Sequence, residues 1–173
     1  MRKHCIAPVA AAVMLAVAGS AQAATTKTAT FGVSATVAPN CLVSAANLAF
    51  GNYLGDPDTP VNVDASSDIS VRCSKNAAFT LALNAGSTAG ATVAQRLLAG
   101  PGTEKLQYNL FTTAARNIVF GDGSSGSVTQ GGTGTGMANV LTTTVFGRLP
   151  DNAFNQAAAT GAYSDTVTVS ITY

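Results

Sequence analysis

Histidine and tryptophan are almost missing from this chain, and charged residues are scarce. The 173 residues include one histidine, His4, no tryptophan and 10% charged residues. Serine and threonine nucleophiles therefore have no histidine base beyond position 4, and no Ser-x-x-Lys arrangement replaces it. A catalytic metal would depend on carboxylates alone, because the imidazole ligands that zinc favours are lacking. These absences predict a protein that is not an enzyme and needs no cofactor and no metal.

Residues 1–23 are predicted to form a secretory signal peptide. Arg2 and Lys3 precede an apolar run from Ile6 to Ala18, and Ala21-Gln22-Ala23 supplies small residues for cleavage. The run is short for a transmembrane helix, and no later run is long or apolar enough to span a bilayer. The expected mature chain, residues 24–173, is one exported domain without a membrane span.

The expected mature chain is close to neutral. Without Arg2 and Lys3 it has seven Lys and Arg against eight Asp and Glu, a formal charge of −1. The cations are scattered along the chain, at Lys27, Arg72, Lys75, Arg96, Lys105, Arg116 and Arg148. Proteins that bind nucleic acids gather such residues on one face, so nucleic acid is not an expected partner.

Two cysteines, Cys41 and Cys73, remain after signal cleavage. In an exported protein such a pair is expected to form a disulfide. The alternative is a reactive or metal-binding thiol pair. It is disfavoured because the sequence offers neither C-x-x-C spacing nor a histidine beside the pair.

Short runs rich in Val, Ile, Thr, Phe and Tyr alternate with Gly, Pro, Asn and Asp clusters, which predicts an all-β sandwich or barrel. The expected strands are 28–37, 41–53, 69–73, 79–83, 106–110, 118–120, 140–146 and 162–173. Residues 74–76 are expected to join two of these strands as a hairpin. Residues 91–99 can hold one helical turn, and the glycine-rich stretch 121–136 is expected to be a mobile loop or a loosely paired hairpin.

Two local motifs have alternative interpretations. Residues 121–126 match G-x-G-x-x-G, but no helix can begin in the glycine-rich stretch that follows, so a simple loop is favoured over a dinucleotide site. Asp56 and Asp58 can bind Ca²⁺ or act as paired carboxylates, with Asp122 or Asp151 completing either site in three dimensions. Their flanking prolines favour a turn.

Two arginines lie beside predicted strands. Arg116 and Arg148 are expected to form surface ion pairs with Asp122, Asp151 or Asp165. Such exposed pairs contribute little stability.

Both ends of the expected mature chain show the period-two pattern of half-buried strands. Ala29, Phe31 and Val33 alternate with polar residues near the start. Near the end, the alternating residues are Val167, Val169, Ile171 and Tyr173. Two such sheet edges need partners, and another copy of the protein is the expected one.

The order of these features resembles the spore coat protein U domain family, which includes the major subunits of archaic chaperone/usher pili. The resemblance covers essentially all of residues 24–173. It is carried by Pro39-Asn40-Cys41, Leu48-Ala49-Phe50-Gly51, Ile69-Ser70-Val71-Arg72-Cys73, Leu106-Gln107-Tyr108-Asn109-Leu110-Phe111, Ala115-Arg116-Asn117, Phe120-Gly121-Asp122-Gly123, Val145-Phe146-Gly147-Arg148-Leu149-Pro150 and the ending from Gly161 to Tyr173.

The resemblance implies an incomplete immunoglobulin-like pilin sandwich with one disulfide, Cys41 to Cys73, completed by a donor strand. The donor would be residues 25–33, with Ala29, Phe31 and Val33 as docking side chains. The acceptor groove would be lined by Val167, Val169, Ile171 and Tyr173. Strand addition of this kind takes affinity from main-chain hydrogen bonds and register from alternate side chains.

The function implied is that of a structural pilus subunit that polymerises by donor-strand exchange into surface fibres for adhesion and biofilm formation. Its partners would be neighbouring pilin subunits, a periplasmic chaperone and an outer-membrane usher, and it would pass through the periplasm to the cell surface. The alternatives are a tip adhesin and a monomeric, self-complemented secreted coat or surface-binding protein.

Overall fold

The computed structural model describes residues 22–173, which fall into two compact units, one ending at Thr36 and the other spanning Val37–Tyr173. Residues 1–21, which hold most of the predicted signal peptide, lie outside the described residues. In the first unit, residues 22–36 are exposed and form no helix or strand. The segment 28–37 is thus not a strand in the single chain, since a strand needs a neighbour for its backbone hydrogen bonds.

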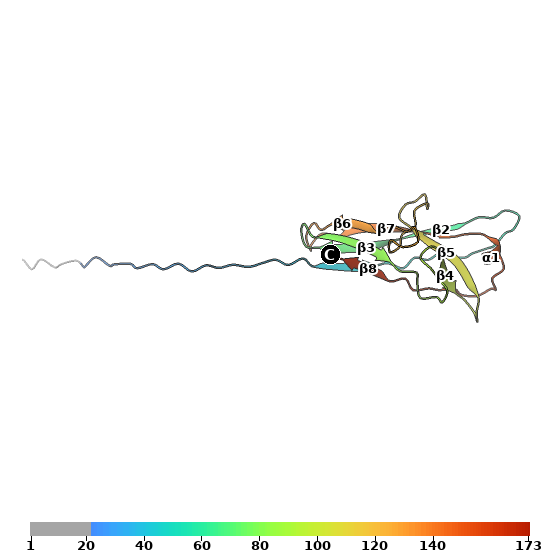
Figure 1. The fold of residues 1–173 in the computed structure, drawn as a ribbon, viewed down its shortest axis with the longest axis horizontal. Helices are drawn as coiled ribbons and strands as arrows, with labels where there is room; N and C mark the ends of the chain where they lie inside the picture. Colours follow the sequence, from blue (N-terminus) through green and yellow to red (C-terminus); the bar gives the residue numbers. More distant parts are fainter. Residues whose placement is uncertain (1–21) are drawn as a thin grey trace, which may run out of the picture. The chain divides into compact units, whose positions relative to one another are not determined.

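The second unit is built from two antiparallel sheets (Figure 1). In spatial order, the larger sheet consists of β1 (Cys41–Ala45), β2 (Val63–Cys73), β7 (Leu141–Leu149), β5 (Lys105–Phe111) and β4 (Arg96–Ala99). The smaller sheet consists of β6 (Gln130–Thr133), β3 (Ala78–Leu83) and β8 (Val169–Thr172). One short helix, α1 (Ala153–Gln156), follows β7. The predicted all-β, sandwich-like class is confirmed.

The core forms where alternate residues of the two sheets meet. Ile69, Val71 and Cys73 of β2 are buried, as are Phe79, Leu81 and Leu83 of β3 and Leu106, Tyr108 and Leu110 of β5. Together they belong to one hydrophobic cluster. The period-two pattern of these strands therefore identified the buried face correctly.

The disulfide joins Cys41 and Cys73, which lie directly opposite each other on β1 and β2. The flanking bonds, Ser74 N to Asn40 O and Ala46 N to Asp68 O, show that even-numbered residues of β1 form the hydrogen-bonded pairs. The cysteines therefore occupy a non-hydrogen-bonded pair, where opposing residues are closest. Their Cα atoms are 4.1 Å apart.

Several expected connections are wrong. Residues 74–76 join strands of different sheets instead of closing a hairpin, and Asn76 takes a left-handed φ of 66° there. Residues 91–99 contain β4 and no helical turn, and 121–136 contains β6. The final strand covers only Val169–Thr172.

The strand registers define two ends of the second unit. We call the end at which β1 begins the proximal end and the opposite end the distal end. At the proximal end, β2 ends at the disulfide and Thr172 of β8 lies opposite Thr80 of β3. At the distal end, β2 begins with Val63, which lies opposite Leu149, the last residue of β7. Helix α1 follows β7 at this end.

No helix within residues 22–173 has the length and apolar character to cross a membrane.

Candidate strand-binding groove

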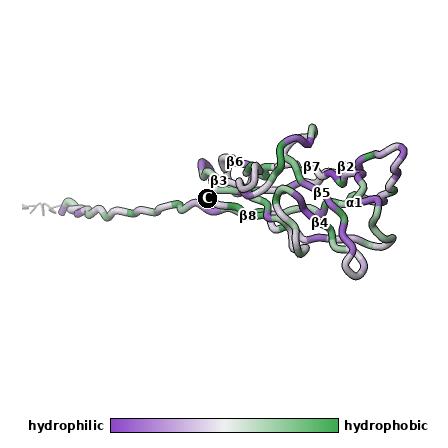
Figure 2. Tube along the Cα trace, turned by 45° about the vertical axis from the view of Figure 1, so that its right-hand side comes forward, coloured by the Kyte–Doolittle hydropathy of each residue, from purple (hydrophilic) through white to green (hydrophobic). Residues whose placement is uncertain are grey.

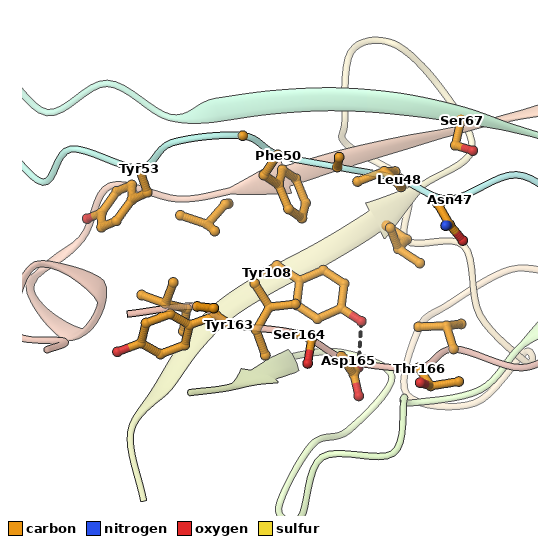
Figure 3. Close-up of a pocket in the computed structure, with 18 of the residues that line it drawn as sticks. Asn47, Leu48, Phe50, Tyr53, Ser67, Tyr108, Tyr163, Ser164, Asp165 and Thr166 are labelled. Carbon is orange, nitrogen blue, oxygen red and sulfur yellow. Dashed lines mark hydrogen bonds between the residues drawn. The ribbon is translucent and has the colours of Figure 1, made fainter. Parts of the chain in front are cut away.

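A groove of about 1250 Å³ lies between two stretches of the second unit that are far apart in sequence. One wall is formed by residues 45–55, which follow β1, and the other by residues 158–167 together with Val169 of β8 (Figure 3). The groove therefore follows the seam between an edge of the larger sheet and an edge of the smaller one.

The floor of the groove is the hydrophobic core itself. Its residues come from both sheets: Ile69, Leu83, Leu106, Tyr108, Leu110, Val145 and Leu149. These floor side chains are almost fully shielded from solvent, so the open apolar surface belongs mainly to the walls. The two sheets therefore leave a hollow along one seam, while the core beneath it stays shielded from solvent.

The walls present apolar and aromatic side chains. Leu48, Phe50 and Tyr53 project from one wall, and Tyr163 projects from the other (Figure 3). The Phe50 and Tyr108 rings meet edge to face, with centroids 5.9 Å apart. All four wall residues are half-buried and pack against the core, so an occupant with alternating apolar side chains would bury what remains exposed.

The edge of β8 leaves backbone groups available. Asn84 N donates to Thr168 O, so even-numbered residues of this strand turn their backbone groups toward β3. In an antiparallel ladder alternate residues face opposite sides. The N–H and C=O groups of Val169 and Ile171 therefore face away from β3, at the sheet edge.

The edge of β1 has the same property. Its even-numbered residues bond to β2, so Cys41, Val43 and Ala45 turn their backbone groups outward. Residues of β1 and β8 approach within 8 Å between Cα atoms. A strand paired to both would need about 9.6 Å between them, twice the spacing of neighbouring strands. At the positions where β1 and β8 lie within 8 Å, the two strands must therefore move apart before another strand can pair between them.

A carboxylate fixes the wall that leads into β8. Asp165 accepts hydrogen bonds from the Tyr108 hydroxyl at 2.7 Å and from the backbone and side chains of Ser87 and Thr88. Burial opposes ionisation of Asp165, but these donors outweigh it and lower its pKa. Burial, and then the bond to Asp165, raises the pKa of Tyr108. A Cβ atom on Gly86, whose φ is +93°, would overlap this carboxylate.

A second carboxylate organises the distal end of the groove. Asp151 accepts hydrogen bonds from the Tyr53 hydroxyl at 2.6 Å, from Gln156 Nε2 at 3.0 Å and from the backbone N–H groups of Asp56 and Val61. The Tyr53 bond is the largest cause that lowers the pKa of Asp151 from 3.8 to about 2. This carboxylate therefore ties the segment before β2 to α1.

The other predicted charge arrangements are resolved differently. Asp56 accepts bonds from Asp58 N and from Thr59, so it closes a turn. Within residues 22–173, no three His, Cys, Asp or Glu residues gather as a metal site. Arg116 and Arg148 both pair with Asp64, at 3.2 and 2.8 Å, instead of the acids expected from the sequence. Residues 121–126 form turns, as the loop interpretation predicts.

The predicted acceptor residues lie at or near this groove. Val167 and Val169 line it, Ile171 packs against the core, and Tyr173 is 53% exposed. In the other unit, the predicted donor side chains Phe31 and Val33 are 88% and 86% exposed, and Ala29 is exposed as well. The assignment of these residues as donor and acceptor stays a prediction.

The groove wall formed by residues 45–55 was not predicted from the sequence. No groove residue was named from the segment after β1, although Leu48 and Phe50 lie two positions apart and face the groove together. That alternation was the available signal. The Asp165 bonds to Ser87 and Thr88 had no such signal, because they join residues more than 70 positions apart.

Comparison with known proteins supports the fold. The chain resembles a chain in the crystal structure of the CsuC-CsuE chaperone-tip adhesion subunit pre-assembly complex from archaic chaperone-usher Csu pili of Acinetobacter baumannii, with 22% sequence identity and a TM-score of 0.50. The likeness covers 80% of this chain but only 41% of that one. No curated protein matches the sequence.

The family comparison covers most of the chain. The Spore Coat Protein U domain matches residues 27–170, which include part of the first unit and nearly all of the second. A match to a coat-protein domain agrees with the prediction that the protein is not an enzyme. The chain therefore belongs to the Spore Coat Protein U domain family.

Proposed function

We propose that this protein is a structural subunit of chaperone-usher fibres and that it polymerises by donor-strand exchange. The observation that carries the proposal is the groove, whose floor is the core and whose edge strands both turn backbone groups outward. A strand from another molecule would satisfy those groups and cover the apolar walls.

The N-terminal segment has the properties of the donor. Residues 25–33 form no strand in the single chain, and Ala29, Phe31 and Val33 would share one face if the segment became extended. Burying a Phe or Val side chain contributes about 1.5–3 kcal/mol each. Register would follow from these side chains, because a shift by one residue would present Thr30 and Gly32 to the groove instead.

The same features give reasons for the proposed partners. An open groove beside a free sheet edge promotes aggregation, so a subunit in transit needs its groove covered. The related Csu structure is a complex of a chaperone with a tip adhesion subunit. By analogy, a periplasmic chaperone would cover the groove here until an outer-membrane usher exchanges it for the next donor, and the fibre would reach the cell surface and support adhesion and biofilm formation.

The test replaces one docking side chain. Phe31→Asp would place a charge against the apolar groove, so subunits should be exported but fibres should be lost from the cell surface. Thr30→Asp is the matched control, because its side chain points to the opposite face of the same strand. Fibre formation is measured by electron microscopy and by the ladder of heat-sensitive polymers on a denaturing gel.

Two results would reject the proposal. Normal fibres from Phe31→Asp would show that this segment is not the donor. A purified wild-type chain that stays monomeric without a chaperone, with its own N-terminal segment in its groove, would favour the self-complemented coat or surface protein.

A further inference from the structure

We propose that the distal end of the second unit is a separate binding surface for the proximal end of another copy of the chain. The proposal rests on donor-strand exchange as the proposed function. It adds a direct contact between neighbouring domains, made outside the groove.

The distal end exposes apolar side chains that the fold does not use. Leu54 is 84% exposed, Val61 is 69% exposed and Phe154 of α1 is 47% exposed. All three belong to segments that Asp151 draws together, since its carboxylate binds Asp56 N, Val61 N and Gln156. Exposed apolar groups gathered in this way are typical of an interaction surface.

The charge of this end is negative. Asp56 and Asp58 lie in the same loop before β2, where the hydropathy colouring of the tube includes hydrophilic stretches (Figure 2), and both are exposed. The Asp58 carboxylate accepts no hydrogen bond from residues 22–173. The nearby cations have other partners: Lys105 donates to Ala89 O at 2.7 Å, and Arg148 pairs with Asp64.

The proximal end carries the opposite charge. Arg72 is next to the disulfide and Lys75 lies in the turn between β2 and β3, and both are exposed. In the described part of the chain neither forms an ion pair or a side-chain hydrogen bond. No acidic residue occurs in the other proximal segments, 37–44 and 134–140. The two ends of the domain are therefore complementary in charge, as a repeating head-to-tail contact requires.

The tether between donor and domain makes a second copy the natural occupant. Eight residue steps separate Val33 from Cys41, the first residue of β1. Fully extended, they span at most about 29 Å. Once a donor is docked, its own proximal end stays within that distance of the groove, at an effective concentration in the millimolar range.

The direction of the donor decides which end of the acceptor its domain meets. β8 runs from the distal to the proximal end, so a donor antiparallel to β8 brings Val33 to the distal end. The opposite direction would bring two proximal ends together and set Arg72 and Lys75 of both copies against each other. Like charges disfavour that arrangement. The antiparallel direction instead places Asp58 opposite Arg72 and Lys75.

Cysteine cross-linking in assembled fibres tests the contact. Cys41 and Cys73 are bonded to each other, so Asp58→Cys and Lys75→Cys introduce new free thiols. Fibres of the double variant, treated with a short bismaleimide, should give a covalent ladder after boiling in detergent. Each single variant should remain monomeric on the same gel. Val61→Cys with Arg72→Cys provides a second pair across the same contact.

The outcomes separate this proposal from the one it rests on. Fibres that form but cross-link through neither pair would overturn the contact while leaving strand exchange intact. Cross-linked dimers from Lys75→Cys alone would overturn it by showing that two proximal ends meet. If Phe31→Asp still assembles normally, the failure lies with strand exchange itself.

Discussion

Removal of the disulfide should weaken the edge of the groove and the whole second unit together. The perturbation is the double variant Cys41→Ser/Cys73→Ser, which frees β1 from a covalent link to β2. The two cysteines are 32 positions apart. In the chain-entropy model, opening a loop of that length costs about 3.7 kcal/mol of unfolding free energy. Domains of this kind have about 5–15 kcal/mol in total, so the loss is a large fraction.

The assay is urea unfolding of the purified mature chain, with and without the substitutions. With a urea dependence of about 1–3 kcal/mol per molar, the midpoint should fall by roughly 1–4 M. Reduction of the wild-type disulfide should give the same shift and serves as the control. A change below about 1 kcal/mol would refute the reasoning, because it would mean that the β1–β2 ladder alone holds this edge of the groove.

Two further predictions concern buried polar groups. Arg96 is fully buried and donates to Asn84 O, Leu83 O, Phe120 O and Asn109 Oδ1. Arg96→Lys keeps the charge but cannot reach all four acceptors. Each buried acceptor left unpaired costs about 1–3 kcal/mol, so the free energy of unfolding should fall by several kcal/mol. Thermal unfolding measures this loss, and an unchanged melting temperature would contradict the prediction. The pKa of Asp151 is about 2 in the folded protein, against an ordinary value of 3.8 in the unfolded chain. As the pH falls, the unfolded chain therefore takes up this proton first. The contribution of Asp151 to stability is thus present above pH 4 and lost between pH 4 and 2. Asp151→Asn should flatten the dependence of the urea midpoint on pH in that window, and an unaltered dependence would assign it to other carboxylates.

The buried face of most strands could be predicted from the sequence because burial is a local, alternating property. Ile69, Val71 and Cys73 show the pattern clearly, and all three are core residues. The disulfide could be predicted because only two cysteines follow the signal peptide. What alternation cannot provide is the partner of each strand. The short turn at 74–76 is compatible with a hairpin or with a change of sheet, and only the packing of the whole domain selects the second.

Long-range polar contacts were beyond local reasoning. Asp151 meets Tyr53 across 98 positions, and both Arg116 and Arg148 select Asp64. Nothing in the spacing of these residues distinguishes Asp64 from the other acids. The groove was half predicted for the same reason. The alternation of residues near β8 indicated one wall, and the two-position spacing of Leu48 and Phe50 was a similar signal, but it does not show that these side chains face β8 across a groove.

The central claim is that the free edge of β8 is completed by a strand from another molecule. Amide hydrogen exchange at Val169 and Ile171 tests it most directly, because their N–H groups face away from β3. These amides should exchange rapidly in monomeric Phe31→Asp protein from which any chaperone has been removed, and should be strongly protected in wild-type fibres. Rapid exchange in the fibres, or equal protection in a wild-type monomer, would contradict the account.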